Sequence, residues 1–373
     1  MNYKSSLAYQ RLTFNHPQAA IQLLLAAGTA DEIYAHRNDI RQIMPDATDT
    51  LCSLLSGDWS PQLSWAEQEI EWCDKKNIRI LVAGTPDYPQ RLINCVDAPI
   101  VLYYLGNADL NSQHIISVVG TRQSTSYGHD MLHTLIADLQ KKIPDVLIVS
   151  GLAYGIDVCS HREAMAAGLP TVGVVAHGLD TMYPAAHRNV AIEMLHNGGL
   201  LTEYTSHTRG DRQNFLRRNR IVAGIADCVI VAESMQHGGS LVTARIANDY
   251  NREVFAIPGR ISDKASEGCN DLIRHNKAYM LTCADDIIDS MGWHTAQETA
   301  AQRSQGIQPS LFPLLSHEQQ VVVQTLHDAD LQQNVISQRC NLPIGQVSSI
   351  LFELEMQGVI KQLAGGTYHL INA

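Results

Sequence analysis

Residues 145–178 read DVLIVSGLAYGIDVCSHREAMAAGLPTVGVVAHG, and their pattern indicates the fold class. Two runs rich in Val, at 145–151 and 171–178, flank a segment of helical length. A nearly unbroken apolar strand is typical of a parallel sheet, because helices cover both faces of such a sheet. The stretch therefore predicts one strand–helix–strand unit of an α/β protein.

The same pattern continues on both sides of this unit. Further apolar runs predict strands at 78–84, 100–106, 114–120, 227–234 and 253–259. Segments of helical length, such as 129–142, lie between the later runs. We therefore predict an extended Rossmann-like domain over residues 66–292, with a doubly wound, mostly parallel sheet.

The two ends of the chain predict smaller units. Residues 1–65 carry helical apolar patterns and no strand-like run, which predicts a small helical domain. Residues 293–312 are polar and lack periodicity, which is typical of a linker. Residues 313–373 predict three helices and a hairpin, a winged-helix-like domain. Its third helix carries acidic residues and no Lys or Arg, so we favour a protein-contact or regulatory role over reading of a DNA groove.

Composition restricts the possible partners. The formal net charge of -11 argues against a surface that coats nucleic acid, so any site for a polyanion must be local. The eight cysteines are scattered without metal-ligand spacing, so we expect reduced, mostly buried thiols and no metal. No apolar run approaches the roughly 20 residues that span a bilayer. We expect a cytoplasmic protein without a signal peptide or a membrane partner.

One segment concentrates positive charge. Residues 209–220 read RGDRQNFLRRNR, with five arginines around Phe215. Several arginines could neutralise successive phosphates, and an aromatic ring that stacks on an unpaired base contributes roughly 1–3 kcal/mol. This combination fits a single strand better than a duplex. The alternative is that Phe215 belongs to the core and that the arginines are solvated or paired with acids.

Glycine-rich loops follow the predicted strands. They lie at 120–128, 150–157, 177–180, 237–243 and 258–260. Small residues at strand ends let backbone N–H groups approach a phosphate, although each loop alone could be a tight turn. Ser240 and Thr243 suit the N-cap of the following helix. No P-loop occurs, and no dinucleotide fingerprint follows the first long strand, so no nucleotide cofactor is predicted.

Catalytic residues have little support in the sequence. Asp157, Glu203 and Glu233 lie near predicted strand ends, and His161 follows on a helix. No Ser-His-Asp order and no metal motif singles them out. Stabilisation of a helix start and helix packing explain Asp157 and His161 better, so we predict no catalytic residue.

Ordered motifs in the central region resemble the DNA-processing protein A family (DprA, also called Smf). The resemblance covers about residues 85–285. It rests on VGTR at 119–122, SGLAYGID at 150–157, FLRRNRI at 215–221, GSLVTA at 239–244, VFAIPG at 254–259 and SEGCNDLI at 266–273. The terminal units are also similar to common family arrangements, with an N-terminal domain of the SAM or helix-hairpin-helix (HhH) type.

This resemblance implies a function. It implies a homodimer that binds and protects single-stranded DNA and loads the RecA recombinase onto it during natural transformation and recombination. It implies no enzymatic activity, no cofactor and no small-molecule substrate. The residues it marks as DNA-binding are Gly120, Arg122, Ser124, Gly151, Arg212, Phe215, Arg217, Arg218, Asn219, Arg220, Gly239, Ser240 and Asn270. Two departures from the family pattern have different consequences. Leu216 in place of a proline predicts a less rigid local backbone, and His237 in place of a basic residue removes a phosphate contact and predicts weaker binding.

Two other functions compete with this one. The first is a nucleoside-monophosphate hydrolase of the lysine-decarboxylase-like Rossmann group, whose members carry P-G-G-x-G-T-x-x-E. Residues 237–245 read HGGSLVTAR, which places Leu241 at the third glycine and Arg245 at the glutamate. The enzyme is therefore disfavoured. The second is a protein-interaction scaffold built from the two terminal domains.

Overall fold

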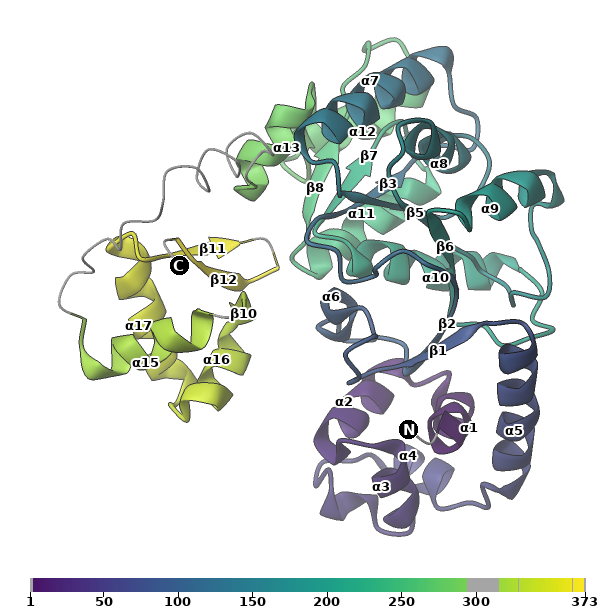
Figure 1. The fold of residues 1–373 in the computed structure, drawn as a ribbon, viewed down its shortest axis with the longest axis vertical. Helices are drawn as coiled ribbons and strands as arrows, with labels where there is room; N and C mark the ends of the chain where they lie inside the picture. The colour runs from purple at the N-terminus through teal and green to yellow at the C-terminus, as the bar shows by residue number, and fades with distance from the viewer. Residues whose placement is uncertain (1–2, 294–314, 328, 364, 372–373) are drawn as a thin grey trace.

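A nine-stranded sheet organises the central part of the chain (Figure 1). The structure is a computed structural model that describes residues 3–293, 315–327, 329–363 and 365–371. The strand order is β1-β2-β6-β5-β4-β3-β7-β8-β9. Strands β1 and β2 are antiparallel additions at one edge, and all other neighbours pair in parallel. The predicted mostly parallel α/β sheet is confirmed.

The strands are short and mostly buried. Their bounds are β1 Arg79–Val82, β2 Val101–Gly106, β3 Ile115–Val119, β4 Leu147–Ser150, β5 Thr171–Val174, β6 Gly198–Thr202, β7 Cys228–Val231, β8 Glu253–Ala256 and β9 Tyr279–Met280. Alternate residues enter two separate cores, one on each face of the sheet: Val149 belongs to one and Ile148 to the other. Two buried faces explain why these strands are nearly continuous apolar runs.

Helices cover both faces of the sheet. They are α7 Ser126–Lys142, α8 Ile156–Ala166, α9 Arg188–Met194, α10 Arg212–Ile225, α11 Gly239–Asp249, α12 Glu267–Arg274 and α13 Ala284–Met291, while the short helix α6 Gln90–Ile93 packs against α10. Strands β6 and β9 were not predicted. Strand β6 contains two glycines and no β-branched residue before Thr202, and β9 has only two residues, so neither gives a periodic signal.

Five helices precede the sheet. They are α1 Tyr3–Thr13, α2 Pro17–Ala27, α3 Ala30–Ala35, α4 Asp49–Leu55 and α5 Ser60–Lys75. Their apolar residues, such as Leu7 and Trp59, join the same core as Val101 of β2. Helix α5 runs through the predicted domain boundary between residues 65 and 66, so a division at that point stays a prediction.

A smaller unit ends the chain. It contains α15 His317–Leu326, α16 Gln333–Cys340 and α17 Ile344–Met356, with strands β10 Leu331–Gln332, β11 Ile360–Leu363 and β12 Thr367–Leu370. The predicted three helices and hairpin are therefore present, and β10 adds a third strand beside β12. Of the predicted linker, only Trp293 lies within the described residues.

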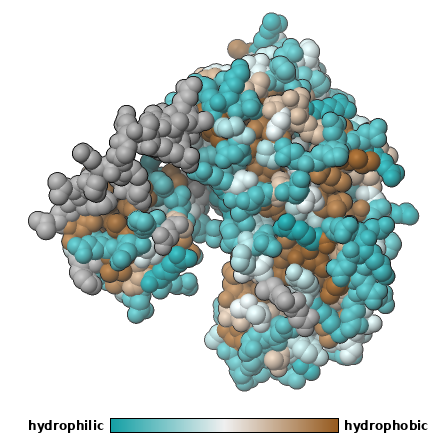
Figure 2. Space-filling view, in the orientation of Figure 1, coloured by the Kyte–Doolittle hydropathy of each residue, from teal (hydrophilic) through white to brown (hydrophobic). Residues whose placement is uncertain are grey.

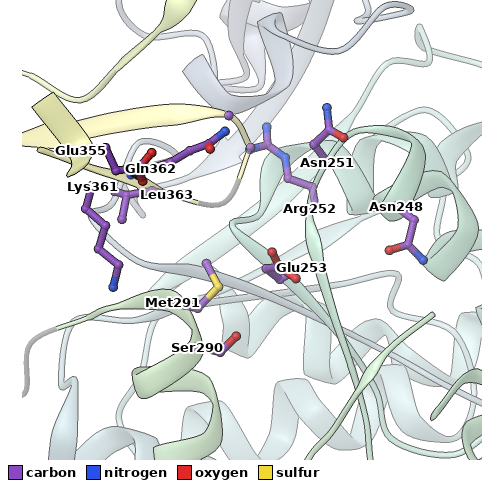
Figure 3. A pocket seen from close by; sticks show the side chains of 12 residues that line it. Asn248, Asn251, Arg252, Glu253, Ser290, Met291, Glu355, Lys361, Gln362 and Leu363 are labelled. Carbon is purple, nitrogen blue, oxygen red and sulfur yellow. Dashed lines mark hydrogen bonds between the residues drawn. The ribbon is translucent and has the colours of Figure 1, made fainter. Parts of the chain in front are cut away.

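The hairpin of this unit meets the central body. The Gly365 N–H donates a hydrogen bond of 2.7 Å to the Asn251 carbonyl. A pocket of about 670 Å³ lies beside this contact, and Figure 3 shows Arg252 on the body side and Gln362 on the hairpin side. Figure 2 shows apolar surface on the smaller unit and where the N-terminal helices meet the sheet.

All eight cysteines are free. Five are buried, Cys52 and Cys340 are half-buried, and Cys283 is exposed. The predicted pattern of mostly buried thiols is confirmed. No described helix is long and apolar enough to cross a membrane.

Candidate nucleic-acid interface

A cleft of about 990 Å³ lies at the carboxyl ends of the central strands. Going outward from β3, strands β4, β5 and β6 follow on one side of it, and β7 and β8 follow on the other side. The strand order therefore reverses between β3 and β7. Ligands of open α/β sheets bind at such a switch point. The cleft brings together eight of the predicted residues: Gly120, Arg122, Arg212, Phe215, Arg218, Asn219, Gly239 and Ser240.

Phe215 is the aromatic centre of the cleft. It is half-buried near the start of α10, with the Arg122 guanidinium 5.4 Å from its ring centroid. The Tyr183 ring lies on Phe215 with centroids 5.5 Å apart and planes inclined by 56°. Arg122 is exposed, and the Tyr183 side chain is 50% exposed. An aromatic platform beside an exposed cation is therefore open to the cleft.

Glu233 holds the loop that carries Arg122. The Thr121 N–H donates to the Glu233 carbonyl at 2.8 Å. The Thr125 N–H and hydroxyl donate to the Glu233 carboxylate at 2.8 and 2.5 Å. Gly155, with φ +75°, packs so closely that an added Cβ would lie 2.2 Å from the Thr121 carbonyl. Glu233 thus positions the loop, which accounts for a carboxylate at this strand end.

Helix α11 points its N-terminus into the cleft. Its N-cap is Gly238, and no side chain caps it. The expected N-capping by Ser240 or Thr243 is wrong, because both lie inside the helix. Ser240 instead donates to the Ser234 hydroxyl at 2.9 Å. Uncapped N–H groups at a helix start favour an anion, since the helix dipole is positive there.

Arg218 reaches the cleft from a buried position. Its side chain is 4% exposed and donates to the Val174 carbonyl. Gly151 makes room for it, since a Cβ at residue 151 would lie 2.1 Å from the guanidinium. Burial lowers the pKa of Arg218 and raises the pKa of Asp157, and each charge opposes the shift of the other. Arg218 and Gly151 therefore support the cleft wall.

Two other arginines of the cluster point away from the cleft. Arg220 is buried in an ion pair with Glu203 and also donates to the Asp97 carbonyl. Arg217 lies over the Phe14 ring, 4.4 Å from its centroid. The alternative interpretation, in which arginines of the cluster pair with acids, therefore applies to Arg220. Arg212 of the cluster and Arg122 of the loop after β3 are exposed.

Ser124 and Asn270 also lie outside the cleft lining. Ser124 is 2.7 Å from the His129 Nε2 atom. The Asn270 amide bonds both backbone groups of Gly259, at 3.1 and 3.0 Å. Asn270 therefore fixes the turn after β8.

The cleft is nearly balanced in charge. Four cations, Arg122, Arg212, Arg218 and Lys264, and three carboxylates, Asp157, Asp211 and Glu267, line it. Tyr183 and Lys264 were not predicted. In the sequence, each of these two residues is marked only by its position after a predicted strand. The sequence does not show that the two loops meet at one edge of the sheet, so neither residue could be assigned to the cleft.

The side chains considered for catalysis have packing roles. The His161 Nδ1 atom lies 2.7 Å from the Thr171 hydroxyl, and burial lowers the pKa of His161 to about 3. Glu203 is paired with Arg220, and burial raises the pKa of Glu203. Within residues 3–293 and the described part of the C-terminal unit, no cluster of His, Cys, Asp and Glu could hold a metal.

Residue 245 decides against the hydrolase pattern. Arg245 is exposed on α11, so this helix presents a cation at the position where that pattern needs its glutamate.

Known protein families match most of the chain. The DNA recombination-mediator protein A family matches residues 79–292, and the DprA winged helix domain matches residues 308–366. Protein Smf of Synechocystis is 30% identical over 330 residues, which cover 81% of this chain and 82% of that protein. DNA processing protein DprA of Streptococcus pneumoniae is 38% identical over 201 residues, 54% of this chain and 70% of that protein.

Solved structures agree with these matches. The X-ray structure of DprA from Streptococcus pneumoniae gives a TM-score of 0.61 at 29% identity, covering 76% of this chain and 97% of that one. A structure of DNA processing protein A from Helicobacter pylori, reported for its single-stranded DNA binding mode, gives 0.52 at 28% identity, covering 58% and 97%. The motifs, the fold and both domain matches therefore show that this chain belongs to the DprA/Smf family of DNA recombination-mediator proteins.

Proposed function

We propose that this protein binds single-stranded DNA in the cleft at the carboxyl ends of β3 and β7. The observation that carries the proposal is the open Phe215 platform between Arg122 and Tyr183. An unpaired base can stack on such a ring, and neighbouring cations can neutralise its phosphates. The single-stranded DNA binding mode reported for the Helicobacter pylori relative supports this assignment.

The cleft favours a single strand over a duplex. The ring of Phe215 is only half-exposed and lies against Tyr183, so a base must leave its stack to reach it. The uncapped start of α11 then offers N–H groups to a phosphate. Of the predicted DNA-binding residues, we assign direct contact to Arg122, Arg212, Phe215, Asn219 and Gly239. Arg218, Arg220 and Gly151 have supporting roles in this assignment, because they are buried.

We also propose the biological role that family membership suggests. A homodimer would place two clefts on one strand and raise the effective affinity. It would protect incoming single strands and load RecA onto them during transformation. No chemical step is assigned to the protein.

The test is fluorescence anisotropy with labelled oligo-dT and a matched duplex at two salt concentrations. Phe215→Ala should weaken oligo-dT binding by about 1–3 kcal/mol. Arg122→Ala should weaken binding and lower the salt slope by about 0.7, the value for one phosphate contact on a single strand. Arg274→Ala is the control, because Arg274 is exposed on α12 and does not line the cleft.

A duplex that binds as tightly as oligo-dT, or binding that both cleft variants leave unchanged, would reject the cleft. RecA loading needs its own assay, in which filament growth is followed on a strand already coated by a single-strand-binding protein. Faster filament growth with the intact chain, lost in Phe215→Ala, would support the loading role.

A further inference from the structure

A second hollow lies between the N-terminal helices and the sheet. Its volume is about 530 Å³. Helix α1, helix α5, strand β2, the segment after β6 and helix α10 all contribute to its lining. Its aromatic side chains are Phe14, Trp65, Tyr103 and Tyr204. Nothing in the function assigned to the cleft uses this hollow.

Helix α10 is a wall that the hollow shares with the cleft. Asn214 lines the hollow, and the next residue, Phe215, lines the cleft. The Tyr204 hydroxyl donates to the Asn214 carbonyl at 3.1 Å, which fixes the aromatic floor to this turn. Because a helix with its side chains is about 10–12 Å across, one flexible strand can reach both sides.

The Arg–aromatic arrangement of the cleft recurs at the hollow. Arg217 lies over Phe14 and Arg11 lies over Trp65, both at 4.4 Å from the ring centroid. Arg122 over Phe215 is the corresponding pair in the cleft. Alternating arginines and aromatic rings are typical of surfaces that follow a single strand.

Each pair can accept one nucleotide. A base stacks on an aromatic ring more strongly than an exposed guanidinium does. A bound strand can therefore draw the guanidinium to a phosphate and place a base on the ring. Arg11 is exposed and free to make this exchange, and Phe14 and Trp65 are half-buried.

A buried carboxylate, that of Glu203, belongs to the lining of the hollow. The Oε1 atom of this carboxylate has no hydrogen-bond partner among the described residues. Its other oxygen pairs with Arg220. A buried acceptor without a partner is costly. Because this atom has almost no accessible surface, a base N–H donor, such as the N3–H group of thymine, would reach it only if the lining opens.

We propose that this hollow is a second nucleotide-binding subsite, which takes a base of the same DNA strand that the cleft holds. The proposal rests on single-strand binding in the cleft and adds that the N-terminal helices contribute to the DNA path. The strand would run from Phe215 across the start of α10 to Phe14 and Trp65.

The test compares two tryptophans of one helix. Trp65 lines the hollow, whereas Trp72, also half-buried on α5, does not. Binding of oligo-dT would be measured for chains from about 4 to about 16 nucleotides, the usual range of site sizes. We expect Trp65→Ala to weaken the longer oligonucleotides roughly five- to tenfold and to leave the shortest unchanged. Trp72→Ala should match the intact protein at every length.

A second variant, at the surface, keeps the test valid if Trp65→Ala unfolds the protein. Arg11→Gln alters an exposed side chain and should lower the salt slope by about 0.7 for the longer oligonucleotides alone. If Phe215→Ala loses binding while Trp65→Ala and Arg11→Gln bind every length like the intact protein, the second subsite is rejected and the cleft stands. If the intact protein binds no oligo-dT, both assignments are rejected.

Discussion

Arg212, at the start of α10, is exposed beside the cleft, whereas Arg218 and Arg220, two turns later, are enclosed by the core. The same residue type therefore has opposite surroundings within one helix. At the start, Asp211 caps the helix and the side chains face open space. Further along, Arg220 pairs with Glu203 and Arg218 bonds the Val174 carbonyl.

This difference shows that a count of arginines overstates the positive charge that is open to a polyanion. Buried arginines stabilise the wall, and exposed ones are available for phosphates. Arg218→Ala would therefore change two things at once: it would remove a cation from the cleft lining, and it would remove the bond to Val174 that supports the cleft wall. Variants that act on only one end of α10 separate the two effects.

The largest effect is expected at the buried end. Arg220→Ala leaves the Glu203 carboxylate buried without its partner, so we expect the free energy of unfolding to fall by about 3–5 kcal/mol. Urea unfolding followed by circular dichroism measures this loss. Replacing both partners, Arg220→Met with Glu203→Leu, should recover most of it, because no buried charge remains. A loss below about 1 kcal/mol in the single variant would show that the pair does not hold the wall.

A smaller loss is expected where the helix begins. The Asp211 carboxylate accepts the Asn214 N–H at 2.8 Å. Asp211→Ala removes this cap and should lower the free energy of unfolding by about 1 kcal/mol, whereas Asp211→Ser should retain most of it. Both variants remove the same negative charge from the cleft, so the cap is judged by comparing them: because the cap orders the turn that carries Phe215, oligo-dT binding should be weaker in the alanine variant than in the serine variant. Equal stability of the two variants would contradict this role.

The exposed arginine should separate binding from stability. Arg212→Ala should change the free energy of unfolding by no more than about 0.5 kcal/mol. The same variant should weaken oligo-dT binding and lower the salt slope by about 0.7. If the variant lost marked stability and bound oligo-dT unchanged, Arg212 would be a structural arginine, as Arg220 is.

An exposed ion pair in the C-terminal unit should have a small, pH-dependent effect on stability and none on binding in the cleft. His369 lies 2.6 Å from Asp330, and both side chains are nearly half exposed. The hydrogen bond to Asp330 raises the pKa of His369, so its contribution is complete below about pH 6.5 and is lost as pH rises through the folded-state pKa. We expect a loss below about 1 kcal/mol, seen as faster hydrogen exchange in β11 and β12. Asp330→Asn should abolish this pH dependence.

The fold was largely predictable because apolar runs report burial directly. Strands such as β3 and β7 are buried on both faces and contain mainly Val and Ile. Strand β6 has the same burial, but its glycines give no such signal. The antiparallel direction of β1 and β2 also depends on long-range pairing, which no local pattern shows.

The site was predictable by residue type and much less by position. Arg122, Phe215 and Gly239 all line the cleft, as the motifs indicated. The inward direction of Arg218 and Arg220 depends on where α10 starts, because a helix turns by about 100° per residue. The sequence did not place that start, so it could not separate exposed arginines from buried ones.

The unequal exposure of the cysteines has a practical consequence for chemistry on the native chain. Burial raises the pKa of the Cys73 and Cys269 thiols to about 12 and that of Cys95 to about 11, so almost no thiolate forms there at neutral pH. The thiolate is the species that alkylating reagents attack. Cys283, which is exposed at the start of α13, should therefore react first with a maleimide. A brief treatment would place a dye on the unmodified protein at Cys283, which lines neither the cleft nor the second hollow.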